Sequence, residues 1–303
     1  MGKIDNPPVS VKPVLTVDVE DWFHICGHAE YAEPRTWDAR PSRVEGGVER
    51  ILGLLAPTPS RATFFVLGWV ARKVPGIVRR IADAGHEIGC HGDLHRRVAE
   101  MSPEEFRADV VRSRDVLQDL LGRRVTAFRA FEWSMRTTAN PALAILVEEG
   151  FALDSSIVDA PPVGVAGNPT RPVVIRTPSG PILEVPPLLG TFFFRRALWG
   201  GGVCMRLTRF SRVNRAIERA LADGSSPVLY CHPWEFDDAH PSMPGLTIVE
   251  RLVKFAGRRR TEKRLKVWLA GHTFAPISTV TVSQTAMSEE DRSLKVNRLG
   301  EAA

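Results

Sequence analysis

The stretch that decides the fold is His86-Glu87-Ile88-Gly89-Cys90-His91-Gly92-Asp93-Leu94-His95. Residues 87–90 have the character of a short strand buried in a parallel sheet, and two histidines follow them. His91 and His95 are spaced i, i+4, so a helical turn that begins near Gly92 would place both imidazoles on one face, where they can share a metal ion. The stretch therefore predicts a buried strand with two metal ligands at its end.

A catalytic metal site needs about three protein ligands, so we expect a carboxylate at the end of another strand. Residues 14–17 form an apolar, β-branched strand, and Asp18, Glu20 and Asp21 follow it within four positions. Like charges crowded this closely at a strand end are costly without a cation. Either run taken alone also fits a solvated surface turn. Together they favour a metal site.

Composition indicates one globular domain with a large core. The chain has 303 residues, of which 25% are charged and 44% are apolar. The net charge of +5 comes from arginines scattered along the chain, and the densest basic run, residues 258–266, lacks interleaved aromatic residues and a nucleic-acid motif. We therefore expect no nucleic-acid partner, and the basic balance suits phosphate-bearing substrates better.

The N-terminal residues and the cysteines predict the compartment. Residues 1–12 contain no apolar leader segment, and the chain has no uncharged apolar run of about 18 residues, the length that spans a bilayer. Cys26, Cys90, Cys204 and Cys231 lack the spacing of a metal site and are expected to be reduced thiols. These features predict a cytoplasmic protein.

Apolar periodicity and turn signals predict strands that alternate with helices, which is typical of βαβ units and a parallel sheet. Residues 158–181, dense in proline and glycine, are expected to form a surface loop. We expect strands at 14–17, 62–67, 87–90, 125–133, 151–156, 182–186 and 227–234, and helices at 44–55, 69–84, 102–121, 140–149 and 208–221.

The residues that can perform chemistry fall at the C-terminal ends of these strands, which is where a parallel barrel assembles its active site. The sequence contains no internal repeat, no glycine-rich phosphate loop and no GxSxG motif. The residues in question are Asp18, Glu20, Asp21, His91, His95, Arg129, Asp154 and His232.

Four short motifs resemble, in order and spacing, those of the polysaccharide deacetylases with NodB homology, carbohydrate esterase family 4. They are residues 18–21, 91–95, 128–130 and 229–232, and the resemblance covers roughly residues 13–275. Residues 17–24, 154–156, 200–202 and 232–236 further resemble the branch associated with bacterial exopolysaccharide and exosortase gene sets. The resemblance implies a deacetylase domain at 12–282. We expect residues 1–11 to be a flexible lead, and residues 283–303, which are polar and lack periodicity, to be a disordered tail.

The resemblance also implies an α/β fold, a distorted parallel (β/α)7-type barrel in a single domain. Its activity would be metal-dependent hydrolysis of amide bonds, removing N-acetyl groups from N-acetylhexosamine units of a bacterial glycan or its precursor. His91 and His95 would hold a divalent ion, with zinc as the expected metal. Asp18 would be the general base, Arg129 would orient it, and His232 would protonate the departing amine. A backbone N–H near Trp133 would help to hold the oxyanion.

Three details depart from the family pattern. The first-motif acids are spaced rather than adjacent, so both Glu20 and Asp21 remain candidates for the third metal ligand: strand parity favours Glu20, and the short, rigid carboxylates of zinc sites favour Asp21. In the third motif, Phe131 and Glu132 stand where the family has proline, which would reshape the pocket or add a charge. The acid that partners His232 has no clear match, and Asp154 is the candidate.

Aromatic residues flank the motifs. Trp22, Trp133 and Trp234 fit stacking on sugar rings about as well as core packing. His24 and His28 could line the pocket. Residues 188–199, apolar with two cations, fit core packing best, but would also suit a cover over the site or a contact with a membrane or a lipid-linked glycan.

Two other functions remain open at this point. An amidase or deformylase of the same fold would act on a small or lipid-linked amide, because a spaced acidic motif resembles those branches too. A catalytically inactive relative would bind glycans through its pocket aromatics and would not need a metal.

Overall fold

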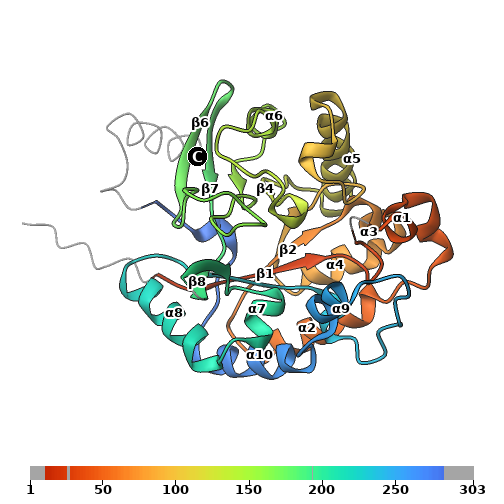
Figure 1. Cartoon of the computed structure of the whole chain (residues 1–303). Helices are drawn as coiled ribbons and strands as arrows, with labels where there is room; N and C mark the ends of the chain where they lie inside the picture. The colour runs from red at the N-terminus through yellow and green to blue at the C-terminus, as the bar shows by residue number, and fades with distance from the viewer. Residues whose placement is uncertain (1–10, 26–27, 193, 283–303) are drawn as a thin grey trace, which may run out of the picture.

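The computed structural model describes residues 11–25, 28–192 and 194–282. Nearly all of the expected lead at 1–11 and the tail at 283–303 lie outside these ranges. An eight-stranded sheet curls into a half-barrel with helices packed around it (Figure 1), and its strand order is β10-β1-β2-β3-β4-β5-β7-β6. In that order the strands are Val228–Cys231, Val14–Val19, Thr63–Val66, Glu87–Cys90, Ala127–Phe128, Leu153–Asp154, Gly180–Glu184 and Val173–Thr177.

Parallel pairing brings the ends of the strands to one edge. The strands β10, β1, β2 and β3 pair in parallel, with Val17 beside both Cys231 and Phe64, and Val66 beside Cys90. Every residue of β1 is buried, as expected for an apolar strand with neighbours on both sides. The segments that follow β1, β3 and β10 therefore leave the sheet close together.

Helices surround the sheet, and one of them differs from expectation. The helix expected over 69–84 is two helices, α3 (Gly68–Lys73) and α4 (Pro75–Asp83). Pro75 stands at the start of α4 and Val74 has a φ of −136°, because the residue before a proline is disfavoured in the helical conformation. The others are α1 (Ala29–Ala32), α2 (Val44–Leu55), α5 (Pro103–Leu121), α6 (Ala142–Glu148), α7 (Gly202–Leu207), α8 (Phe210–Ala222), α9 (Ile248–Phe255) and α10 (Arg259–Gly271).

Two hairpins occupy segments where no hairpin was expected. The predicted surface loop at 158–181 contains β6 and the start of β7, which pair antiparallel around a turn at 177–180. The segment 188–199 forms a separate hairpin of β8 (Leu189–Phe192) and β9 (Arg195–Leu198). The expected strands at 125–133 and 151–156 shorten to two residues each, β4 and β5. The residues that follow β4 and β5 form loops that reach the site instead of continuing the strands.

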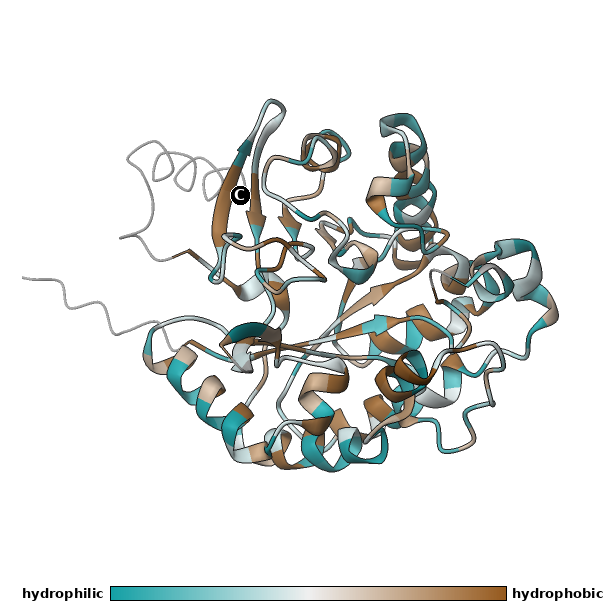
Figure 2. Cartoon of the chain, viewed as in Figure 1, coloured by the Kyte–Doolittle hydropathy of each residue, from teal (hydrophilic) through white to brown (hydrophobic). Residues whose placement is uncertain are grey.

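Apolar residues concentrate on the strands and on the helix faces that meet them (Figure 2). No helix in the described part of the chain has both the length and the apolar character needed to cross a bilayer.

Candidate active site

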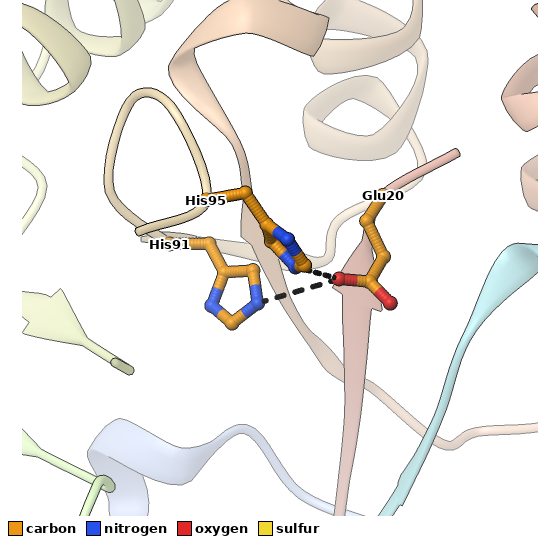
Figure 3. Close-up of side chains that lie close together, drawn as sticks. All are labelled: Glu20, His91 and His95. Atoms are coloured by element: carbon orange, nitrogen blue, oxygen red, sulfur yellow. Dashed lines mark hydrogen bonds and ion pairs between the residues drawn. The ribbon is translucent and has the colours of Figure 1, made fainter. Parts of the chain in front are cut away.

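Three buried side chains converge at the ends of β1 and β3 (Figure 3): Glu20, His91 and His95. One ligand atom from each lies within 4.8 Å of the others. The Oε2 of Glu20 is hydrogen-bonded to Nε2 of His95 and lies 4.0 Å from Nε2 of His91. Burial opposes ionisation of Glu20, but the three histidines around it, led by His95, hold the pKa of Glu20 well below its ordinary value. One carboxylate oxygen and two imidazole nitrogens form a donor set that suits zinc.

The two histidines meet through a loop rather than through the helical turn that the i, i+4 spacing suggested. Gly92 and His95 both have a positive φ, 75° and 54°, which a right-handed helix does not contain. Buried Asp109 of α5 accepts hydrogen bonds from the N–H groups of Asp93 and Leu94, at 2.7 and 3.1 Å. These bonds replace those that a helical turn would make and fix the loop between the two histidines.

Neighbouring groups orient the two imidazoles. The Nδ1 of His91 is 2.9 Å from the backbone oxygen of Arg129. If Nδ1 carries the proton and donates it to that oxygen, Nε2 is unprotonated and faces Glu20. Phe131 packs its ring against that of His95, with centroids 3.5 Å apart. Glu132 points instead to the surface, where it pairs with Arg97 at 2.7 Å. The third motif thus contributes packing to the cluster, and its acid lies outside it.

Asp21, the other candidate for the third ligand, is turned toward the start of α2. Its Oδ1 accepts a hydrogen bond from the N–H of Trp22 at 2.9 Å, and its Oδ2 accepts from Ser42 Oγ at 2.5 Å and from the N–H of Arg43 at 3.0 Å. Burial raises the pKa of Asp21. Among the described residues, the cluster contains Glu20 and not Asp21, as strand parity favoured.

Asp18 lies one step back along β1 and is held by a buried arginine. Arg129 donates to Oδ1 of Asp18 at 2.9 Å, to Oγ1 of Thr16 at 2.7 Å and to Oγ of Ser155 at 2.9 Å. Its guanidinium carbon lies 4.4 Å from the centre of the Phe65 ring. Because these contacts come from several strands, the arginine fixes Asp18 in one position.

His232 enters from the end of β10. Its Nε2 lies 4.0 Å from Oδ2 of Asp18 and 3.7 Å from Oε1 of Glu20, while its Nδ1 is 2.8 Å from Oε1 of Glu235. Burial opposes protonation of His232, but the acids around it, Glu235 first, raise its pKa. For Glu235, burial is outweighed by His232 and Arg206, which lower its pKa.

The histidine's acidic partner is therefore Glu235, which the sequence analysis missed. A short 3₁₀ helix, Pro233–Phe236, follows His232 and places residues three apart on one side. That spacing was the available signal. Asp154, the candidate for this role, bonds instead to Ser156 and pairs with Glu184.

Trp234 and Lys254 complete the wall behind the acids. Trp234 stacks on His232 with centroids 4.9 Å apart, and its Nε1 donates to Oε1 of Glu20 at 3.2 Å. Buried Lys254 places its Nζ 4.3 Å from the Trp234 ring centre and donates to the backbone oxygen of Trp22 at 2.8 Å. Burial lowers the pKa of Lys254 to about 8. Nothing near Lys254 in the sequence indicated this role.

The remaining aromatic candidates differ in placement. Trp133 lines a pocket together with Tyr230, at 4.6 Å between ring centroids, and its buried Nε1 has no partner among the described residues. Trp22 is 5% exposed and donates its Nε1 to Pro41 O, so it packs rather than lines that pocket. His24 is also buried and accepts from the N–H of Asp21.

Two family models match the chain. Residues 35–143 match the model described as polysaccharide deacetylase, and residues 155–282 match a domain of unknown function, DUF3473. Residues 35–143 therefore contain a polysaccharide deacetylase domain. His91, His95 and Arg129 lie in the deacetylase domain, and His232 and Glu235 lie in the segment that matches DUF3473. Asp18 and Glu20 precede both.

Sequence relatives cover part of the chain. A peptidoglycan-N-acetylglucosamine deacetylase of Bacillus cereus is 40% identical over 73 residues, which are 24% of this chain and 26% of that protein. A peptidoglycan deacetylase of Helicobacter pylori is 29% identical over 114 residues, 38% of each protein. The chain thus spans less than half the length of these curated relatives.

A solved structure resembles almost the whole chain. A protein of Mycobacterium smegmatis, provisionally assigned as a polysaccharide deacetylase, superimposes with a TM-score of 0.61 at 23% identity. The match covers 96% of this chain and 93% of that one. The likeness confirms the expected fold, a distorted (β/α) barrel.

Proposed function

We propose that this protein is a metal-dependent hydrolase that removes N-acetyl groups from N-acetylhexosamine units of a bacterial glycan or its precursor. One observation carries the proposal: Glu20, His91 and His95 form a buried donor set, with Asp18 and His232 beside it. The donor set fits a divalent ion, for which we propose zinc. Such an ion supplies Lewis acidity, which polarises an amide carbonyl and makes water more acidic.

The chain's own residues supply the proton transfers. Asp18, held by Arg129, accepts a proton from the attacking water while the water oxygen bonds to the amide carbon. His232 gives its Nε2 proton to the amide nitrogen as the C–N bond breaks, so acetate and an amine are released. The 4.0 Å between Asp18 Oδ2 and His232 Nε2 supports this assignment, because both groups can then reach one reacting group.

Positioning residues and the pocket support this assignment. Glu235 accepts the Nδ1 proton of His232, which keeps Nε2 facing the substrate and favours the charged imidazole. Trp133, with its unpartnered buried Nε1, would bind the sugar or its acetyl group, and Trp234 would hold the Glu20 side chain. The further likeness of residues 232–236 to the exopolysaccharide branch leads us to propose an exopolysaccharide as the glycan.

Elemental analysis and product analysis test the proposal. The wild type should bind about one divalent ion per chain, and the double variant His91→Ala/His95→Ala should bind none. Asp18→Asn should keep the ion and lose most of the acetate release from N-acetylhexosamine oligomers, roughly a hundredfold or more. Release of formate or ammonia in place of acetate would replace this function by that of an amidase or deformylase. Failure to bind any ion after reconstitution would overturn the metal-dependent mechanism.

A further inference from the structure

The helix α9 presents its apolar side chains to solvent. Ile248 is 79% exposed, Val249 68%, Leu252 57% and Val253 50%. Figure 2 shows α9 as a hydrophobic ribbon at the surface. Helices of globular proteins bury their apolar face, so an exposed one indicates a surface that meets another apolar phase.

The opposite face of α9 is already occupied. A helix advances by about 100° per residue, which places the four exposed aliphatic residues within an arc of about 140°. Lys254 lies opposite that arc, and it is the residue whose Nζ bonds to Trp22 O beside the active site. The hydrogen bond of Lys254 to Trp22 O fixes the rotation of α9 about its axis, and in that orientation the apolar arc of α9 faces outward.

Neighbouring residues extend the surface toward the site. Leu207, 52% exposed, lies against Gly257 just beyond α9. We call Leu207, Ile248, Val249, Leu252 and Val253 the outer patch. Val253 also lines the pocket that contains Leu198 of β9 and, deeper, Trp133 and Tyr230. The outer patch therefore borders the opening of a pocket that leads toward His232, whose ring centroid is 5.9 Å from that of Tyr230.

The exposed charges around the outer patch are mainly positive. Arg251 lies within α9, and Arg259 and Arg260 follow it, all three exposed. Within the described part of the chain none of the three forms an ion pair, whereas the acid of α9, Glu250, is bound to His28 at 2.8 Å. An apolar helix face flanked by arginines is complementary to the surface of an anionic bilayer, where the aliphatic residues enter the acyl boundary and the cations meet the headgroups.

We propose that the outer patch docks the protein on an anionic lipid bilayer, with the pocket opening at that surface. A glycan carried on the membrane would then reach Asp18 and His232 through the pocket, a consequence that rests on the proposed function. The docking itself does not.

Vesicle sedimentation tests the docking. The full chain is mixed with vesicles of phosphatidylcholine alone, or of phosphatidylcholine and phosphatidylglycerol in equal parts. We expect binding to the mixed vesicles, weakened by salt, and little binding to phosphatidylcholine. The double variant Val249→Ser/Leu252→Ser should bind about tenfold or more weakly, because each side chain loses the benefit of entering the apolar layer. Val267→Ser on α10 is the matched control, because Val267 is 54% exposed outside the outer patch, and should bind as the wild type does.

Several outcomes would overturn the docking proposal: no binding to either vesicle, equal binding by the double variant, or self-association that the double variant abolishes, which would assign the outer patch to a second copy of the chain. The altered residues are exposed, so circular dichroism should show an unchanged fold. Vesicle binding is measured without turnover. Binding without acetate release would therefore defeat the proposed function and leave the docking intact.

Discussion

The Nδ1 of His232 lies 2.8 Å from Oε1 of Glu235, three residues further along the chain. The second oxygen of Glu235 accepts from Thr261 Oγ1 at 3.0 Å, and Arg206 lies 3.7 Å from it. The carboxyl is thus fixed from both sides, and the orientation of the imidazole is fixed with it. Under the proposed mechanism, Glu235 controls which proton His232 can deliver.

Replacing Glu235 tests that control. Glu235→Gln should lower kcat by roughly 10–100-fold, the usual effect of losing an orienting partner, with little change in metal content. Steady-state acetate release and elemental analysis measure the two quantities. The acid Glu218, exposed on α8, provides a control in Glu218→Gln, which should keep wild-type kcat. Full activity in Glu235→Gln would show that His232 does not need the partner.

Replacing Glu20 and Asp21 one at a time tests which of them binds the metal and which only stabilises the fold. Glu20→Gln should lose most metal affinity, because the amide cannot supply a charged oxygen to the cluster. Asp21→Asn should keep the metal and lower the melting temperature, because Ser42 and the N–H of Arg43 lose a charged acceptor at the start of α2. Metal titration and thermal unfolding of both variants decide the assignment. The opposite pattern would make Asp21 the ligand.

The loop between the two histidines depends on Asp109. Asp109→Ala removes the acceptor for the N–H groups of Asp93 and Leu94, so His91 and His95 lose their fixed separation. We expect metal affinity to fall by roughly 10–100-fold, as for other supports of metal ligands. Competition with a chromogenic chelator measures it. Asp119→Ala, exposed on the same helix, should bind metal as tightly as the wild type. Equal metal affinities of Asp109→Ala and Asp119→Ala would show that the loop does not depend on Asp109.

A buried acid pair predicts the pH dependence of stability. Burial raises the pKa of Asp154 to about 6 and that of Glu184 well above its ordinary value. The folded state therefore holds protons that the unfolded chain releases near pH 4, so the pair's stabilisation is complete below that pH and declines as pH rises through about 6.

Glu184→Gln should remove the loss of stability that the acid pair causes as the pH rises. The amide can donate to Asp154 while its oxygen still accepts from the N–H of Ile157, now 3.1 Å from Oε1. At pH 8 the melting temperature should rise by roughly 2–4 °C, the shift that about 1 kcal/mol produces in a domain of 150–250 residues, and at pH 4 it should not. Differential scanning calorimetry at both pH values measures the difference. Asp83→Asn, exposed on α4, should leave both values unchanged. A lower melting temperature of Glu184→Gln at pH 8 would contradict the raised pKa values of the pair.

The sequence predicted those parts of the site that follow from local pattern. Glu87–Cys90 and Val44–Leu55 have the bounds expected for them, because apolar periodicity and burial agree there. Asp18, in β1, and Glu20, just beyond its end, both face His232, at 4.0 and 3.7 Å from its Nε2, which agrees with the expectation from strand parity. Asp21 falls on the other side, where α2 begins.

The rest depended on contacts between distant segments. Lys254 reaches the site across 232 residues, from its Nζ to the backbone oxygen of Trp22, and no local pattern encodes that distance. His91 and His95 have the spacing of a helical turn, but the loop between them is not helical. Its N–H groups bond to Asp109 of α5, a contact that the local sequence does not indicate. The β6–β7 hairpin lies in a segment whose prolines and glycines indicate a loop, and only pairing with β5 gives it a place in the sheet.

The pairing of β10 with β1 also determines when the sheet can be completed during synthesis on the ribosome. Val14 pairs with Val228, so β1 keeps an unpaired edge until most of the chain has been synthesised. The side chains of Glu20, His91 and His95 are all present once residue 95 has emerged, long before His232. A nascent chain would expose an apolar strand edge, a known template for aggregation, until β10 arrives. The last strand brings His232 to the site and also covers the edge of β1.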